Sequence, residues 1–433
     1  MPPFDLDYLV VKYSPLGVQL WTNRFGNEGV DETVRGFVLA TNGNVYLTGT
    51  AGTIKYNSSG LPAWSTSHAG RDITIDSNEN CYVTGFIDTD FSVVKLDAGG
   101  SNLWTKTWNY ANQQDISHVI AVDHAGGVWI AGLATLFCDR LQCHLEFWAV
   151  KYGASGEFLF STLLFEGGYY ANSKYDGFEC DAAGDLYMAV KLRNNQAPRS
   201  WGARKISSTG QIIWGKGLSR ALHAEGVARM ILDQHANVYY TGTDYAGYQT
   251  FKLTRDGTNI WAANYRPGNV GFHRAYGIAA DVEGNAYVTG QFEVPGAGND
   301  YATIKYGNNG TNGTVLWVKR FTEAGNSDDQ AHAIALGPNG EVYVTGFSNP
   351  TNGLYEITTI KYVQTSPIEK KSDGAILLSF CGTPGSNYTI QACATLTNWT
   401  NIGSATANPS GLYTFQDTNA PSHPQRFYRA LEQ

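Results

Sequence analysis

The sequence has few charged residues, no long apolar segment and no cluster of basic residues. Lys, Arg, Asp and Glu make up 16% of the 433 residues, and the formal net charge is -8. Binding to a phosphate backbone needs clustered cations, so no nucleic-acid partner is expected, and the acidic balance gives no reason to expect attraction to an anionic membrane. No run of 18 or more apolar residues occurs, so no membrane-spanning helix is predicted.

The first residues, Met-Pro-Pro-Phe-Asp, also lack a basic stretch followed by an apolar one, so no signal peptide is visible. We nevertheless expect that such a peptide has been removed, because richness in Asn, Thr, Gly and Tyr is typical of secreted β-proteins.

Glycine and aromatic residues are abundant. The chain contains 49 Gly, 26 Tyr and 11 Trp residues, and 42% of its residues are hydrophobic. Aromatic side chains pack well on pleated sheets, and the glycines have no three-residue period, which excludes collagen. The composition therefore predicts many short strands, in a chain long enough for two domains or for a repeat array with an appendage.

The cysteines predict one local disulfide. Cys138 and Cys143 stand in one insertion, and a zinc site with Asp139 and His144 is the alternative, although no second half of such a site is found elsewhere. Cys81 and Cys180 fall on predicted inner strands as small buried residues. The remaining two cysteines, Cys381 and Cys393, are close enough in sequence to pair with each other.

One sequence unit recurs along most of the chain. Its first part is a glycine followed four positions later by an aromatic residue. A lysine at the end of a β-prone run precedes the glycine by five positions in six units and by eight in the seventh. The glycine and aromatic pairs are Gly17/Trp21, Gly60/Trp64, Gly100/Trp104, Gly156/Phe160, Gly210/Trp214, Gly257/Trp261 and Gly313/Trp317.

The second part of the unit is an apolar strand, a turn of the form Asp-x-x-Gly-Asn, and a second apolar strand, as in residues 278–290. Glycine allows positive φ and aspartate accepts hydrogen bonds from its own backbone, so the pattern predicts a hairpin. A calcium loop is disfavoured because acidic residues are too sparse at ligand spacing. The repeated aromatic residue is expected to pack between sheets, and the lysine to extend along apolar surface or pair with a carboxylate.

These strands predict an all-β fold in which residues 1–364 form a seven-bladed β-propeller of four-stranded blades. The strand before the Asp turn is expected to line the central channel and the aromatic strand to lie outermost. The strand at Trp21 is expected to complete the last blade, whose inner strands come from residues 331–362, so that strands from both termini close the ring. One lysine strand, 7–13 or 356–362, is then a surplus fifth or displaced strand.

The repeated sequence unit ends at Tyr362, and a different sequence pattern follows it. Residues 365–374 are predicted to be a linker, and residues 375–433 a small β-sandwich of the immunoglobulin or fibronectin kind around Trp399. A carbohydrate-binding role for this sandwich has no motif behind it.

The repeat resembles the bacterial propeller repeat called SBBP, which is related in pattern to NHL repeats. The resemblance covers about residues 5–364 and rests on the lysine strand Thr303-Ile-Lys-Tyr306, the Gly-x-x-φ-Trp strand and the Asp-x-x-Gly-Asn hairpin. It implies a bacterial protein that is extracellular, on the cell surface or periplasmic, and it brings no catalytic motif. The C-terminal segment, with Leu396-Thr-Asn-Trp399 and a closing Phe-Tyr-Arg, resembles a terminal domain of secreted proteins from environmental bacteria, which implies export or surface attachment.

In a propeller the loops that enter the inner strands converge on one face, where function usually lies. Alignment of the units places one residue just before each inner strand: Arg35, Arg71, His118, Asp176, Ala228, Tyr276 and His332. Three residues earlier stand Glu32, His68, Asp115, Ser173, Glu225, His273 and Asp329. The longest loops add Tyr169, Tyr170, Tyr175, Tyr265 and Arg266, with Trp148 at the edge of one of them.

This rim predicts a candidate site for a glycan or protein ligand. The arginines would neutralise a carboxylate, and His118, His332 and Tyr276 are the candidate catalytic residues for proton abstraction beside it. The candidate binding residues are Arg35, Arg71, Asp115, Asp176, His68, Glu225, His273, Asp329 and Tyr170. Polar residues are also expected at any channel entrance that faces solvent.

Three functions therefore stay open. The first is a non-catalytic, monomeric binding or scaffold protein that recognises a polysaccharide or protein ligand. The second is a polysaccharide lyase or hydrolase, and the third is a purely structural surface protein. No cofactor or metal is expected.

Overall fold

The computed structural model describes residues 7–14, 18–138, 143–165, 177–192, 200–220, 226–244, 247–266, 273–294, 298–308, 313–322, 328–337, 340–349, 356–362, 368–381, 385–395, 397–408 and 412–432. The described chain is built of β-strands, with one short 3-10 helix, η1 (Ala420–Ser422), near its end. No helix within these ranges has the length and apolar character needed to cross a membrane.

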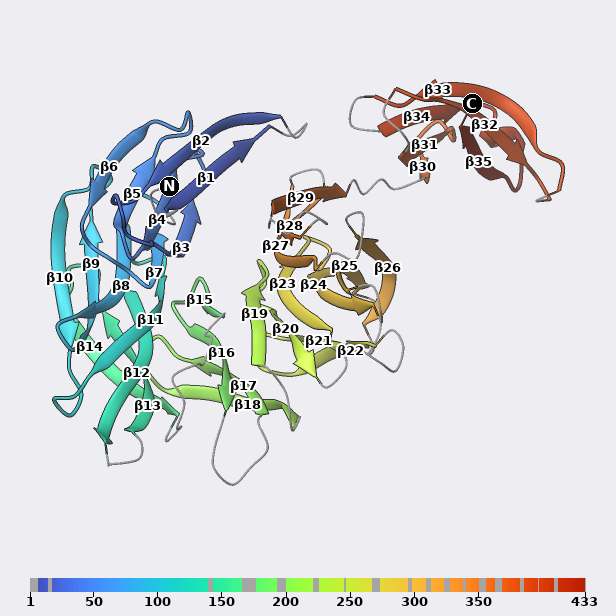
Figure 1. The fold of residues 1–433 in the computed structure, drawn as a ribbon. Helices are drawn as coiled ribbons and strands as arrows, with labels where there is room; N and C mark the ends of the chain where they lie inside the picture. The colour runs from blue at the N-terminus through green and yellow to red at the C-terminus, as the bar shows by residue number, and fades with distance from the viewer. Residues whose placement is uncertain are drawn as a thin grey trace. The chain divides into compact units, whose positions relative to one another are not determined.

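Six antiparallel four-stranded sheets follow one another along the chain, each joined in sequence order (Figure 1). The first two sheets contain β3 (Val34–Leu39), β4 (Val45–Gly49), β5 (Gly52–Tyr56) and β6 (Pro62–Thr66), and then β7 (Asp72–Ile75), β8 (Cys81–Ile87), β9 (Asp90–Leu96) and β10 (Asn102–Trp108). The third and fourth contain β11 (Asp115–Val122), β12 (Val128–Cys138), β13 (Cys143–Tyr152) and β14 (Phe158–Phe165), and then β15 (Phe178–Cys180), β16 (Leu186–Leu192), β17 (Ser200–Ile206) and β18 (Ile212–Arg220). The fifth and sixth contain β19 (Gly226–Leu232), β20 (Val238–Asp244), β21 (Gly247–Leu253) and β22 (Asn259–Tyr265), and then β23 (Arg274–Ala280), β24 (Ala286–Val294), β25 (Gly298–Gly307) and β26 (Thr314–Phe321).

Two smaller sheets stand at the ends of this series. Strands β1 (Tyr8–Tyr13) and β2 (Gln19–Phe25) pair with each other, and β27 (Gln330–Leu336), β28 (Val342–Ser348) and β29 (Glu356–Tyr362) form a three-stranded sheet. Within the described residues β2 does not pair with the sheet of residues 331–362, and closure of the ring by this strand stays a prediction. The partner of β2 is the lysine strand β1, which is its neighbour in sequence and needs only a short loop to reach it.

The recurring tyrosine, lysine and tryptophan lie side by side on three neighbouring strands. Tyr46 is the cross-strand partner of Lys55, and Lys55 is the partner of Trp64. The lysine ammonium stands over the tyrosine ring, 5.0 Å from its centre. The same register recurs in the other five four-stranded sheets, with Trp129 in place of the tyrosine and Phe160 in place of the tryptophan in the third.

In five of these six sheets, an Asp turn lies at the end of the row. In the hairpin between β23 and β24, Asp281 accepts hydrogen bonds from the backbone N–H groups of Glu283 and Asn285, and its other oxygen accepts one from the Tyr287 hydroxyl at 2.8 Å. Lys305 lies 3.8 Å from the same carboxylate. The predicted hairpin turn and the predicted lysine–carboxylate pair are confirmed here, and both are structural.

Six of the seven repeated aromatic rings pack on a glycine of the next sheet. A Cβ on Gly100 would lie 2.7 Å from the Trp64 ring, and Gly100 has φ +88. The same contact joins Gly60 to Trp21, Gly210 to Phe160 and Gly257 to Trp214. In the sequence pattern Gly-x-x-φ-aromatic, the glycine therefore packs against the preceding sheet and the aromatic residue packs against the following sheet. This confirms the predicted packing role of the aromatic residue.

The apolar cores lie between consecutive sheets rather than inside one sheet. One core combines Tyr46 with Ile73, Val83 and Val94 of the following sheet, and four further cores join the later four-stranded sheets in the same way. A sixth core packs Tyr8 and Val10 of β1 on the sheet β3–β6. Four-stranded sheets stacked face to face in sequence order are consistent with a β-propeller.

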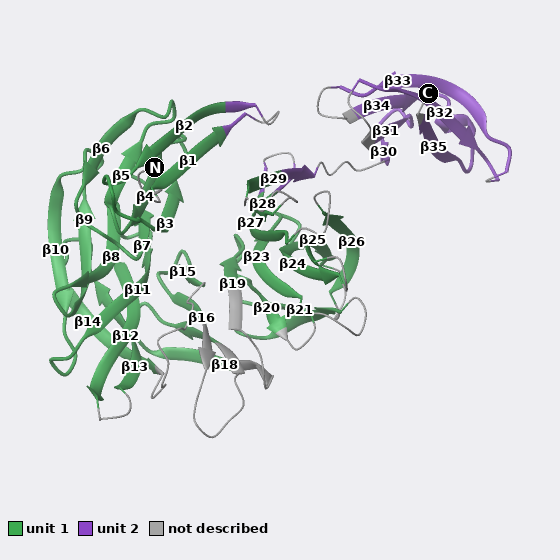
Figure 2. Cartoon of the chain, in the orientation of Figure 1, with its two compact units in different colours: residues 1–12, 20–335, 344–359 green, residues 13–19, 336–343, 360–433 purple. Residues whose placement is uncertain are grey.

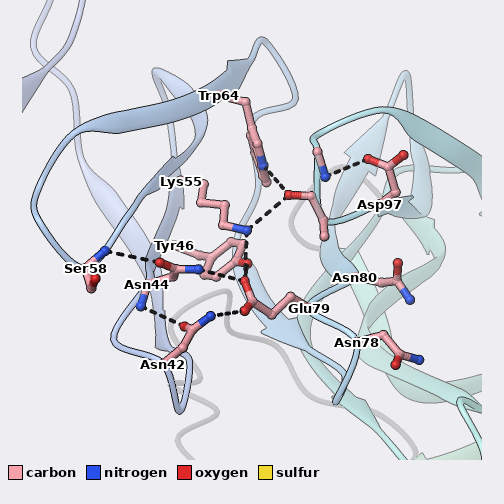
Figure 3. Close-up of polar contacts among 12 residues, drawn as sticks. Asn42, Asn44, Tyr46, Lys55, Ser58, Trp64, Asn78, Glu79, Asn80 and Asp97 are labelled. Carbon is pink, nitrogen blue, oxygen red and sulfur yellow. Dashed lines mark hydrogen bonds and ion pairs between the residues drawn. The ribbon is translucent and has the colours of Figure 1, made fainter.

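Polar contacts also cross from sheet to sheet (Figure 3). The Lys55 ammonium donates to the Ala98 carbonyl oxygen at 3.1 Å, and Trp64 Nε1 donates to the same oxygen at 3.0 Å. The carboxylate of Glu79, in the β7–β8 turn, lies 2.8 Å from Lys55 Nζ and accepts a hydrogen bond from the Tyr46 hydroxyl. Glu79 thus does for the first sheet what the Asp of the turn does elsewhere, since residue 40 is alanine.

The chain divides into two compact units, and the second consists of residues 13–19, 336–343 and 360–433 (Figure 2). Its strands are β30 (Ile368–Lys370), β31 (Ile376–Cys381), β32 (Asn387–Cys393), β33 (Thr400–Thr406), β34 (Leu412–Asp417) and β35 (Phe427–Glu432).

These strands form two three-stranded antiparallel sheets, β30-β31-β34 and β33-β32-β35, which share a core. Leu378 of one sheet and Ile390 of the other are fully buried in it. The Trp399 ring lies 4.3 Å from the Arg429 guanidinium, so the two motif residues at the ends of this segment meet. Strand β30 stands within residues 365–374, where the sequence predicted a linker; its Ser-Asp-Gly turn and the apolar residues of β31 let it pair as a hairpin.

The predicted disulfide between Cys138 and Cys143 is formed, and it occupies both sulfur ligands of the alternative zinc site. Cys393 is a buried free thiol, so the pairing with Cys381 is not formed. Cys81 is buried and free as expected, and burial raises the pKa of its thiol to about 12. Cys180 is a free cysteine that is half-buried.

Candidate functional site

Three of the predicted rim residues lie together at the starts of three consecutive inner strands. Arg35 lies on β3, Arg71 directly precedes β7, and His118 lies on β11. Arg35 is exposed, whereas Arg71 and His118 are half-buried. We call these three residues the cationic site.

The charges of the cationic site act on one another. Burial, followed by the charge of Arg35, lowers the pKa of Arg71. Burial, followed by the charges of Arg71 and Arg35, lowers the pKa of His118 to about 4. His118 is therefore neutral near pH 7.

The arginines have spare capacity for an anion. No ion pair to Arg35 or Arg71 occurs within the described part of the chain, and the buried Nε of Arg71 has no hydrogen-bond partner there. The Arg71 guanidinium stands 5.8 Å from the centre of the Phe86 ring, which holds its stem in place. A carboxylate placed here would receive charge-assisted hydrogen bonds and relieve the repulsion between the two arginines.

The residues three positions earlier have a structural role. Asp115 is fully buried, and its carboxylate accepts hydrogen bonds from the backbone N–H of Tyr110 at 2.6 Å and of Thr135 at 3.0 Å. His273 is also buried, stacks on Phe292 at 4.3 Å and accepts a hydrogen bond from the Glu293 N–H. These side chains satisfy backbone groups of the loops that enter the sheets, which is the work that buried polar groups most often do.

For two further members of this set, the described hydrogen bonds are made by the backbone and not by the side chain. Asp329 is fully buried, and its backbone N–H donates to the Asn299 carbonyl oxygen. His68 is half-buried, and its carbonyl oxygen accepts a hydrogen bond from the Thr53 hydroxyl at 2.6 Å. The side chains of Asp115 and His273 thus have structural partners, and the predicted binding role of the four residues stays a prediction. Asp176, Glu225 and Tyr170 lie outside the described residues.

The other two candidate catalytic residues form a second cluster. The rings of Tyr276 and His332 stack 4.8 Å apart, and His332 also stacks on Phe347 at 5.2 Å. The Tyr276 hydroxyl donates to Gln291 at 3.3 Å. Ring stacking joins His332 to Tyr276, whereas His118 interacts with the arginines through their charges.

Sequence reasoning missed an acid on the inner strand β15. Burial raises the pKa of Glu179 to about 7, and Arg229 opposes this shift. Its carboxylate accepts a hydrogen bond from the backbone N–H of Leu232 on β19 at 3.0 Å. Asp72 joins β7 to the backbone N–H of Ile120 in the same way.

A signal for Glu179 was present in the repeat. The residues at the same position of the other units, two before the Asp-turn position, are Val38, Thr74, Ala121, Ile231, Ala279 and Ala335, and none is charged.

In the described ranges, no group of three or more His, Cys, Asp or Glu side chains is arranged to hold a metal ion.

Comparison with known proteins finds no matching family and no matching curated sequence. Among solved structures, Hsv2 of Kluyveromyces lactis is 10% identical with a TM-score of 0.43, covering 76% of this chain and 98% of its own. A gluconolactonase of Xanthomonas campestris is 11% identical with a TM-score of 0.35, covering 59% and 82%. A glucose dehydrogenase is 10% identical with a TM-score of 0.37, covering 67% and 95%. Similarities this weak assign no function.

Proposed function

We propose that residues 1–364 form a seven-bladed β-propeller of the SBBP type that binds an anionic glycan at the cationic site. The protein is then a binding or scaffold protein of the bacterial cell surface, the periplasm or the medium. The C-terminal unit is then an immunoglobulin-like or fibronectin-like sandwich that serves export or attachment. The anionic ligand is proposed because Arg35 and Arg71 repel each other and have no carboxylate partner in the described chain.

Closure of the ring is supported by one exposed side chain. Phe37 on β3 is 57% exposed, whereas the residues at its position in the next sheets, Ile73 and Ile120, are each 5% exposed. Those residues are buried by a preceding sheet, and Phe37 would be buried if β27–β29 stood before β3. The hairpin β1–β2 then supplies the outer strand that β27–β29 lacks, and one of the two lysine strands, β1 or β29, is in excess.

A uronate polymer fits the cationic site best among glycans. Its carboxylates repeat at every ring, and arginine forms paired hydrogen bonds with a carboxylate. A neutral glycan gives the two guanidinium groups no counter-charge.

The test is calorimetric titration with polygalacturonate at low ionic strength. Arg71→Ala and Arg35→Ala are each expected to weaken binding about tenfold or more, since a hydrogen bond between charged groups contributes about 1.5–3 kcal/mol. Arg255→Ala removes the same charge from an exposed turn between β21 and β22 and is expected to leave binding unchanged. Equal affinities for all four proteins would refute the proposal.

A lyase is the second candidate, because the neutral imidazole of His118 beside two arginines suits a general base that abstracts a proton next to a neutralised carboxylate. Incubation with polygalacturonate would then produce absorbance from unsaturated uronates. That signal is expected to disappear in His118→Ala while binding persists. If the wild-type protein binds polygalacturonate but produces no such absorbance, the result would support a binding protein and exclude a lyase for this polymer.

A further inference from the structure

A cluster of aromatic rings lies where the end of β10 meets β13 of the next sheet. Trp108 stacks parallel to Tyr110 at 5.9 Å, and Trp148 lies 4.9 Å from Tyr110 and 5.6 Å from Trp108. All three residues are half-buried, so each keeps part of its ring at the surface.

Only one of the three rings belongs to the repeat. Trp108 packs on Phe91 at 5.2 Å, as Phe25 packs on Tyr8 and Phe321 on Tyr301 in other units. Trp148 stands three residues before the lysine, where the other units have Leu9, Gly52, Ser92, Gly202, Gln249, Ala302 and Thr358. Trp148 packs against the core between these two sheets, but the other units show that such packing does not require a tryptophan at this position.

The loop that carries Tyr110 is held in a strained conformation. Ala111 and Asn112 both have left-handed φ, of 59 and 51. The Tyr110 N–H is bound by Asp115, and Asn109 donates to the Asp90 carboxylate at 2.6 Å. Strain of this kind persists where the surroundings enforce it, and it often marks a functional segment.

Glu146 fixes two of the rings and keeps acceptor capacity. Trp148 Nε1 donates to its carboxylate at 3.0 Å, and burial, followed by a hydrogen bond from the Tyr110 hydroxyl to the same carboxylate, raises the pKa of Tyr110. An ionised carboxylate has about four lone-pair sites, so two remain for ligand hydroxyl groups.

The aromatic surface continues along β13 to the tip of the hairpin. His144, Glu146 and Trp148 alternate along the strand, each two positions from the next, and therefore share one face of it. His144 stacks on Phe137 at 4.0 Å, and Phe137 is 48% exposed. The disulfide Cys138–Cys143 closes the tip directly beside them. The face from His144 to Trp148 is about 13 Å long at the usual rise of a strand.

We propose that Trp108, Tyr110, Trp148, Glu146, His144 and Phe137 form an aromatic strip that binds a neutral hexopyranose chain. Sugar rings have apolar faces that stack on tryptophan and tyrosine, and their hydroxyls donate to a carboxylate. The strip contains Glu146 and no lysine or arginine, and Asp90 and Asp115 hold its loop, so a neutral sugar is favoured over a uronate. The strip includes no residue of the cationic site, so it stands independently of the function proposed there.

The experiment is titration of the full-length protein with cellohexaose, laminarihexaose and mannohexaose, followed by tryptophan fluorescence and calorimetry. At least one of these oligosaccharides is expected to bind, and Trp148→Ala is expected to weaken that binding about tenfold or more. Glu146→Gln is expected to weaken it less, because the amide still offers an oxygen acceptor.

Trp64→Ala is the matched control, because Trp64 is a half-buried tryptophan that packs between sheets outside the strip. It is expected to lower the melting temperature and leave the oligosaccharide affinity unchanged. If Trp148→Ala does not fold, Tyr110→Ala is expected to show the same loss of binding. No binding of any of the three oligosaccharides to the wild-type protein, or equal binding by the strip variants, would overturn the proposal.

Discussion

Glu79 and Glu179 show how the surroundings of a carboxylate set its contribution to stability. Lys55, Tyr46 and Asn44 hydrogen-bond to Glu79 and lower its pKa to about 2, so the fold favours its ionised form. Burial raises the pKa of Glu179 to about 7, so the fold favours its neutral form. Opposite effects of pH on stability follow from the two shifts.

Glu79→Gln is expected to lower the free energy of unfolding by about 1–3 kcal/mol at pH 7, because the bonds from Lys55 and Tyr46 lose their charged acceptor. The folded pKa of Glu79 is below the unfolded value of 4.5, so its contribution is complete above pH 4.5 and is lost as the pH falls towards 2. Urea denaturation at pH 7 and pH 3 measures both effects. Glu28→Gln, at an exposed position, is the control, and an equal loss in both variants would contradict the assignment.

Glu179→Gln is expected to raise stability at pH 8 by roughly 1–3 kcal/mol, because ionisation of the buried carboxyl opposes folding there. The folded pKa lies above the unfolded value, so wild-type stability falls as the pH rises from 4.5 to about 7. The amide oxygen can still accept the Leu232 N–H, so the two proteins should be nearly equal at pH 4. Denaturation curves across this range would show parallel profiles if Glu179 were not buried in its neutral form.

At the scale of the elements, the contact between a tryptophan and the glycine of the following sheet is the repeated joint. The tryptophan ring packs closely only where the facing residue has no Cβ, and the third turn of the sheet requires a residue with positive φ. A single glycine meets both requirements. The ring contact recurs from Trp21 on Gly60 to Trp261 on Gly313, although Gly313 itself does not have positive φ.

Gly100→Ala tests the contact between the tryptophan ring and the glycine, and Gly29→Ala is its control. Both glycines have positive φ, +88 and +78, so both alanine variants carry a left-handed strain of about 1–2 kcal/mol. An added Cβ meets the Trp64 ring at 2.7 Å in the first case and nothing within 4 Å in the second. Thermal unfolding is therefore expected to show a larger loss for Gly100→Ala, and equal losses would mean that the ring moves aside freely.

At the scale of the whole molecule, the order of the sheets leaves two ends, and the proposed closure brings them together. A stack of sheets that ends in an exposed inner strand carries apolar side chains without a partner. On β3 these side chains are Phe37 and Leu39, which are 57% and 59% exposed.

Phe37→Ala measures closure in solution. If β27–β29 covers β3, the substitution is expected to cost about 3–5 kcal/mol, as for a buried phenylalanine. If the ring stays open, the cost should be within about 0.5 kcal/mol, as for a surface residue. Val282→Ala, at a side chain that is 84% exposed, gives the surface reference in the same denaturation experiment.

The sequence by itself determined the repeated unit, because each hairpin turn, lysine and tryptophan acts within one sheet or against its neighbour. Local spacing therefore predicted the strands, the Asp turn and the packing role of Trp64. It also predicted the disulfide Cys138–Cys143, whose two cysteines are only five positions apart.

Only the tertiary structure decided which polar residues are used to hold the fold together. Asp115, His273 and Asp329 stood at aligned positions near the predicted rim, but they are buried, and Asp115 and His273 accept hydrogen bonds from backbone groups that are distant in sequence. Arg35, Arg71 and His118 interact because three sheets place their inner strands next to one another. The aromatic strip likewise joins the end of β10 to β13 of the next sheet, because contacts between sheets depend on packing that no single unit encodes.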